Sequence, residues 1–80
     1  MNPPPRRLYL PKRIRVSTGG SGQPVALGRA KVESVREEWL VEDRWWTPRP
    51  LHRRYFELVL ADGRDAVVFR EGGDWYRQRA

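Results

Sequence analysis

Short runs of alternating apolar and polar residues cover most of this chain, and such alternation is typical of half-buried β-strands. The pattern predicts strands at 13–17, 24–28 and 31–41, the first of them with a basic outer face. The stretch TGGSGQP after the first strand lacks the Gly-Lys-Ser/Thr ending of a phosphate-binding loop, so we interpret it as a hairpin connection. Together these elements indicate an all-β protein.

The segment 31–41 fits two templates. As a helix it would carry four apolar residues on one stripe: Val32, Val35, Trp39 and Leu40. As a strand it would place three on one face: Val35, Trp39 and Val41. Because β-branched and aromatic residues carry the pattern, we favour a strand with a bulge and keep the helix as an alternative.

The C-terminal part predicts a hairpin. Asp62-Gly63 between two β-rich runs is a strong signal for a two-residue turn. The register that follows gives three facing pairs: Leu60–Asp65, Leu58–Val67 and Phe56–Phe69. One face then presents five side chains to a core: Phe56, Leu58, Leu60, Val67 and Phe69.

A second turn, at residues 72–73, continues the hairpin into a meander. It places Phe69 opposite Tyr76 and Arg70 opposite Trp75. Tyr76 then joins the core face, whereas Trp75 lies with Arg70 on the opposite face.

Three strands with one apolar face need a covering layer, which only the earlier strands can supply. The expected fold is therefore a small curled antiparallel sheet or an SH3-like barrel of five to six strands, formed by residues 13–80. The Pro-rich and basic residues 1–12 are expected to form an extended, flexible arm. Trp45 and Trp46 precede two prolines that forbid ladder pairing, so the chain is expected to turn there. Because successive strand residues alternate between the two faces, one tryptophan is expected to point inward and the other outward.

Charge is unevenly distributed along the chain. Residues 1–31 hold seven basic residues and no acid, whereas residues 32–80 hold nine basic and ten acidic residues. The net charge of +6 therefore originates in the N-terminal part, and it favours an anionic partner. Nearly all the cations are arginine, which suits bidentate phosphate contacts and stacking, although a codon bias toward arginine explains the same composition.

Other functional classes find little support. Without cysteine the chain has neither a disulfide nor a thiolate metal site, which favours a reduced, cytoplasmic setting. No run approaches the ~20 apolar residues of a membrane span, so no membrane partner is expected. The single histidine, His52, has no spaced partner for a metal, and no serine has a base and an orienting group. We therefore expect no catalytic residue, no metal and no cofactor, and we do not expect an enzyme.

The order of aromatic and turn residues in the last half of the chain resembles a known family. Three stretches carry the resemblance: WLVEDRWW, PLHRRYFELVLADGR and VFREGGDWYRQ. They are similar to a small bacterial domain that occurs alone and also at the C-terminus of the inactive Y-family polymerase homologue of the damage-inducible mutagenesis complex. The resemblance implies an accessory role in DNA repair or damage tolerance, with a repair polymerase or another protein as a partner. It implies no activity and no binding residues.

Two functional hypotheses follow. In the first, the domain binds single-stranded or duplex nucleic acid, with phosphate contacts from arginine and lysine and with base stacking on an exposed tryptophan. Its candidate residues are Arg6, Arg7, Lys12, Arg13, Arg15, Trp46, Arg49, Arg53, Arg54 and Trp75. In the second, the domain is a protein adaptor or a homodimer without nucleic-acid contact, and an edge strand such as 13–17 extends a partner's sheet. Packing of the arginines over the protein's own rings is a structural alternative to the first.

Overall fold

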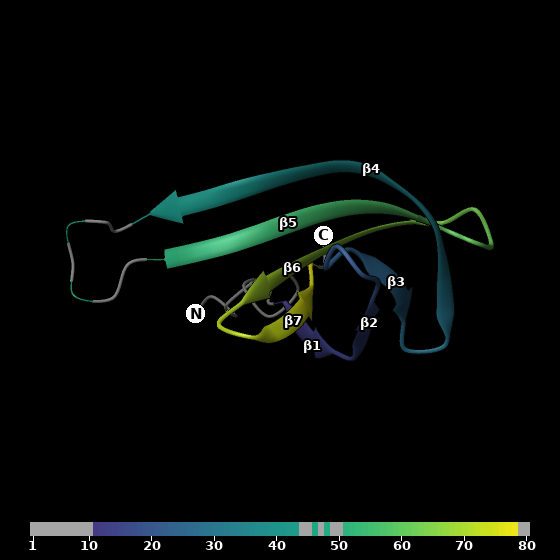
Figure 1. The fold of residues 1–80 in the computed structure, drawn as a ribbon, viewed down its shortest axis with the longest axis horizontal. Coiled ribbons are helices and arrows are strands. Elements are labelled where there is room, and N and C mark those ends of the chain that lie inside the picture. The colour runs from purple at the N-terminus through teal and green to yellow at the C-terminus, as the bar shows by residue number, and fades with distance from the viewer. Residues whose placement is uncertain (1–10, 44–45, 47, 49–50, 79–80) are drawn as a thin grey trace, which may run out of the picture.

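Antiparallel strands account for almost all of the regular structure. The computed structural model describes residues 11–43, 46, 48 and 51–78 (Figure 1). Its strands are β1 (Lys12–Ile14), β2 (Val16–Thr18), β3 (Pro24–Leu27), β4 (Ala30–Asp43), β5 (Leu51–Leu60), β6 (Asp65–Glu71) and β7 (Asp74–Arg77). Within the described ranges no helix is long and apolar enough to cross a membrane.

The strands form one sheet that nearly closes into a barrel. Their order is β1-β7-β6-β5-β4-β3-β2, and every neighbouring pair is antiparallel. The two edge strands, β1 and β2, are consecutive in the chain and separated only by Arg15, whose carbonyl accepts a hydrogen bond from the Gly28 N–H at 2.8 Å. This confirms the expected small all-β barrel, with seven strands because the predicted first strand is broken at Arg15.

The long strand β4 confirms the strand interpretation of residues 31–41. Its pairing with β5 shifts register twice, between Val32 and Ser34 and between Val35 and Glu37. These bulges explain the imperfect alternation of the sequence, because each adds one residue and moves the following side chains to the other face. From residue 37 onward the pairing is regular. Beyond Leu40 and Arg54, where the pairing of β5 with β6 ends, β4 and β5 continue as a two-stranded ribbon to the left of the barrel (Figure 1).

The hairpin between β5 and β6 differs from the predicted two-residue turn. The Leu60 N–H donates to the Arg64 carbonyl at 2.8 Å, which leaves a loop of three residues, 61–63. Gly63 has a φ of 89°, the left-handed conformation that ends such a loop. Because the side-chain period of a strand is two, this shift of one position reverses the predicted face of every β6 residue.

The core lies on the inner face of the barrel. Its buried side chains are Leu27, Phe56, Leu58, Leu60, Ala66, Val68 and Trp75. The predicted β5 residues are therefore right, but Val67 does not belong to this face. The predicted register between β6 and β7 is confirmed, whereas the predicted faces are reversed: Trp75 is in the core and Tyr76 is on the outer face with Phe69.

A row of four aromatic rings crosses the outer face. Trp39, Tyr55, Phe69 and Tyr76 face one another on β4, β5, β6 and β7. Successive ring centroids lie 5.2, 4.9 and 5.2 Å apart. The Arg53 guanidinium lies 4.5 Å from the Phe69 centroid, and Phe69 is only 1% exposed although it points away from the core. Aromatic packing therefore stabilises this second layer.

Candidate nucleic-acid interface

Four basic side chains form a row across four neighbouring strands on the inner face. We call them the cationic row: Arg54 of β5, Arg70 of β6, Arg77 of β7 and Lys12 of β1. Arg54 lies directly opposite Arg70, and Lys12 lies directly opposite Arg77. Arg70 and Arg77 are diagonal neighbours, because Arg70 faces Trp75, two residues before Arg77.

Strand alternation assigns the cationic row to the inner face. Lys12 is two residues before Ile14, which packs against the core, and Arg77 is two residues after the buried Trp75. Arg77 is half-buried, and the other three side chains of the row are exposed. The row is therefore accessible to a ligand.

The cationic row has little compensating negative charge. Arg54 pairs with Glu38 of β4, and its Nε donates to Glu38 Oε2 at 2.6 Å. Across the described part of the chain, no acidic side chain forms an ion pair with Lys12, Arg70 or Arg77. Like charges directly opposite each other destabilise a sheet, so this arrangement favours an anion as ligand.

Two arginines of the cationic row lie over rings of the core. The Arg54 guanidinium is 5.5 Å from the Phe56 centroid, and that of Arg70 is 6.0 Å from the Trp75 centroid. The negative face of a ring attracts a cation, while the apolar stem of the arginine covers the core and its head stays in water. The core therefore positions these two cations.

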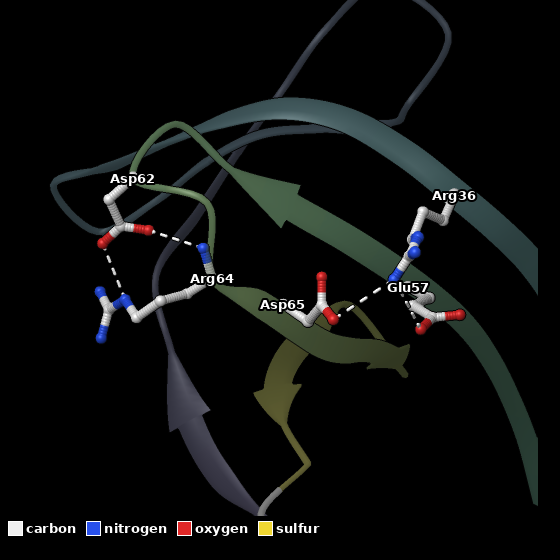
Figure 2. Close-up of polar contacts among 5 residues, drawn as sticks. All are labelled: Arg36, Glu57, Asp62, Arg64 and Asp65. Carbon is white, nitrogen blue, oxygen red and sulfur yellow. Dashed lines mark hydrogen bonds and ion pairs between the residues drawn. The ribbon is translucent and has the colours of Figure 1, made fainter.

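Two arginines away from the cationic row are neutralised by neighbouring acids. Figure 2 shows Arg36 of β4 reaching to Glu57 and Asp65, with closest N–O distances of 3.8 and 3.3 Å. In the β5–β6 loop, the Arg64 Nε lies 2.7 Å from Asp62 Oδ2. These cations are less available to an external anion than those of the row.

Arg13 and Arg53, two of the predicted nucleic-acid contacts, lie on the outer face in ion pairs. The Arg13 Nη2 is 2.9 Å from Asp74 Oδ1, and the Arg53 Nε donates to Glu71 Oε1 at 3.0 Å. Desolvation lowers the pKa of Arg53, but the hydrogen bond to the Tyr55 hydroxyl and the charge of Glu71 outweigh it and raise the pKa. Arg53 also lies over the Phe69 ring, which favours the structural alternative for this residue, whereas Arg13 is engaged by Asp74 with no ring contact among the described residues.

The predicted stacking residues have different environments. Trp75 is 8% exposed and packs on Phe56 at 5.5 Å between centroids, so the expectation that it is exposed is wrong. The cause is the three-residue loop between β5 and β6, which shifts the register by one residue and places Trp75 on the inner face. Trp46 is 66% exposed beyond the end of the β4–β5 ribbon, and Arg15 is exposed at the break between β1 and β2. Both stay candidates.

Several predicted elements lie outside the described residues. They are Arg6 and Arg7 with most of the expected N-terminal arm, Arg49, and Trp45. The expectation that Trp45 and Trp46 point to opposite sides stays a prediction.

Sequence reasoning missed Arg70 and Arg77 as candidate ligands of an anion. A signal existed for Arg77, because the correctly predicted turn at 72–73 also places it opposite Val68. The pairing of Arg54 with Arg70 required the three-residue loop, which the sequence did not distinguish from a two-residue turn.

The described part of the chain holds no group of three or more His, Cys, Asp or Glu residues that could bind a metal ion. The Nδ1 of His52 lies 3.4 Å from a Glu42 oxygen, which makes an ion pair only when the imidazole is protonated. Comparisons with protein-family models, curated proteins and solved structures found no match.

Proposed function

We propose that this domain is a non-enzymatic nucleic-acid-binding module whose cationic row contacts the phosphate backbone. The observation that carries this proposal is the two pairs of directly opposed cations, Arg54 with Arg70 and Lys12 with Arg77. A sheet that places like charges opposite each other loses stability, and a bound polyanion reverses that cost.

The length of the cationic row favours a polyanion over a single anion. Neighbouring strands lie about 4.7–4.9 Å apart, so four cations on four strands extend over roughly 14 Å. A nucleic-acid backbone carries a line of charges at comparable spacing, and each contacted phosphate releases condensed counterions. Arg6 and Arg7 come six and five residues before Lys12 in the chain, and they add positive charge to the N-terminal part of the sequence.

The cellular setting is proposed from the sequence. The similarity to the domain found with the inactive Y-family polymerase homologue supports an accessory role in DNA repair or damage tolerance, and the lack of cysteine supports a cytoplasmic location. Phosphate contacts fix the position of a ligand but carry no sequence information, so the cationic row is expected to bind without sequence preference.

The proposal is tested by fluorescence anisotropy with a short labelled single-stranded oligonucleotide. The test variant is Arg70→Gln/Arg77→Gln. The matched control is Arg36→Gln/Arg64→Gln, which removes the same charge from positions outside the row. We expect the control to bind nearly as the parent does, and the test variant to bind much more weakly.

The salt dependence separates phosphate contacts from other binding. Log affinity should fall linearly with log salt between about 50 and 200 mM, and the test variant should lose about 0.7–0.9 of slope per removed contact. Equal losses in the two variants would mean that only net charge matters. Absence of binding at low salt would overturn the proposal.

A further inference from the structure

The edge of β4 that faces away from β5 is open over most of its length. β3 pairs with β4 only at Ala30 and Lys31, although β4 continues to residue 43. In the described part of the chain no strand lies beside the remaining edge, and Figure 1 shows β4 as the outermost strand of the ribbon. An open edge presents unpaired backbone N–H and C=O groups that can pair with another strand.

The second half of this edge has the geometry of a docking strand. Both register shifts of β4 lie before Glu37, and from there the pairing with β5 is uninterrupted. Bulges obstruct strand addition, because they bend the strand and interrupt its ladder. The bulged first half is therefore protected, and the regular segment 37–43 is not. We call this segment the β4 edge.

Exposed apolar side chains lie at the middle of the β4 edge. Leu40 is 61% exposed and Trp39 is 37% exposed. A shallow hollow beside them is lined by Glu38, Trp39, Leu40 and Arg54. Leu40 points to the inner face and Trp39 to the outer face, so a strand added here would cover apolar surface on both sides.

The charge of β4 indicates the chemistry of the partner. Four of its acids lie between residues 33 and 42: Glu33, Glu37, Glu38 and Glu42. The one base between them, Arg36, is held by Glu57 and Asp65. A second copy paired antiparallel about Leu40 would place Glu38 opposite Glu42, which is unfavourable. A basic strand has the complementary charge.

We propose that the β4 edge binds an extended basic segment of a partner protein by strand addition. Backbone hydrogen bonds to residues 37–43 supply affinity, and alternate side chains supply specificity. The segment that fits has an apolar residue beside Leu40 and basic residues beside Glu37 and Glu42. An arginine beside Trp39 would also stack on its ring. This surface adjoins the cationic row at Arg54, but its occupation by a basic strand does not require nucleic acid.

The experiment uses the full chain labelled with ¹⁵N and two model peptides of equal length. The Lys-Val peptide has valine at the position that faces Leu40 and lysine at the positions that face Glu37 and Glu42, and the Glu-Val peptide has glutamate in place of each lysine. Amide hydrogen exchange and chemical shifts are followed for every residue. We expect the Lys-Val peptide to slow exchange at residues 37–43 selectively and the Glu-Val peptide to leave these amides unchanged. Any binding of the Glu-Val peptide to the cationic row would appear at other residues.

Matched variants test the role of charge. Glu37→Gln/Glu42→Gln should weaken binding of the Lys-Val peptide, by up to about fivefold for each lost exposed pair. Glu71→Gln/Asp74→Asn removes equal charge from β6 and β7, two and three strands from β4, and should leave the affinity unchanged. Circular dichroism establishes that both variants are folded.

Three results would overturn the proposal. One is unchanged exchange at residues 37–43 with the Lys-Val peptide. Another is equal weakening by both double variants, which would mean a non-specific charge effect. The third is protection of the β4 edge in the protein alone with a mass that rises with concentration, which would identify a second copy as the occupant.

Discussion

The ring of Trp39 stacks on the ring of Tyr55, with centroids 5.2 Å apart and planes inclined by only 7°. Tyr55 also contacts Phe69 on its other side, so it connects the ring of Trp39 with the buried ring of Phe69. This stacking adds side-chain contacts to the backbone pairing of β4 with β5 and connects Trp39 to the centre of the sheet. The outer face is therefore a structural layer of its own.

Replacing Tyr55 with leucine should destabilise the barrel. The variant loses ring contacts with Trp39 and Phe69, each of about 0.5–1.5 kcal/mol, so we expect a loss of about 1–3 kcal/mol in urea unfolding. Tyr55→Phe keeps the rings and loses only the hydrogen bond from Arg53, at a cost of about 0.5–1.5 kcal/mol. Equal losses in both variants would show that the stacking contributes nothing.

Trp75→Ala should strongly destabilise the protein rather than remove a ligand contact. Trp75 is a buried core residue, and truncating a buried tryptophan costs about 3–5 kcal/mol. For a domain of this length the whole stability is of the order of 4–12 kcal/mol. Urea unfolding measures the loss, with Leu40→Ala, at a 61% exposed position, as a control expected within about 0.5 kcal/mol of the parent.

Iodide quenching offers an independent check on the same residue. Trp75 should be shielded from iodide in the folded protein, whereas Trp46, at 66% exposure, should be quenched. Fluorescence titrations with an oligonucleotide would then report on the exposed tryptophans. Full quenching of the Trp75 emission would contradict its place in the core.

The positions of the strands could be predicted from the sequence, but the face of the sheet on which each side chain lies could be predicted only in part. Local alternation and the turn glycines located the strands, and the register across residues 72–73 was right. The β5–β6 register was wrong because Asp62-Gly63 is compatible with both two- and three-residue loops. One hydrogen bond between Leu60 and Arg64 decides between them, and it depends on the packing of the whole sheet.

The candidate site was harder to predict than the fold. Lys12 and Arg54 were recognised from the local density of basic residues, but their partners in the cationic row come from strands β6 and β7. Which residues of four strands lie side by side depends on the register of each strand pair. The error in the β5–β6 register placed Arg70 on the wrong face, so the cationic row was not predicted. Ion pairs such as that between Arg13 and Asp74, 61 residues apart, also cannot be seen in local charge counts.

The loop carboxylate Asp62 should make stability depend on pH at acidic values. The Arg64 backbone N–H donates to Asp62 Oδ1 at 3.0 Å and is the main cause of a lowered pKa; desolvation opposes it, and the Arg64 guanidinium adds to it. Because the pKa of Asp62 is lower in the folded state than in the unfolded state, its carboxylate stabilises the fold at pH values above the unfolded pKa of about 3.9. This contribution is lost as the pH falls through the folded pKa.

The expected measurement is a carboxyl NMR titration in which Asp62 has its midpoint below about 3.9. Urea midpoints of the parent should fall in the same acidic range. Asp62→Asn should flatten that part of the pH profile, because an amide does not titrate. A parent and variant that lose stability in parallel would show that Asp62 makes no pH-dependent contribution.

Arg70→Glu should separate stability from binding. Opposite charges across a strand pair contribute roughly 0.2–1 kcal/mol, so a glutamate facing Arg54 should raise the urea midpoint even though the contact with the Trp75 ring is lost. The gain should shrink at high salt, because the side chains are exposed and screened. Oligonucleotide affinity should fall at the same time, since the variant interrupts the cationic row. If the variant is more stable in urea but binds the oligonucleotide as the parent does, Arg70 is not a phosphate ligand.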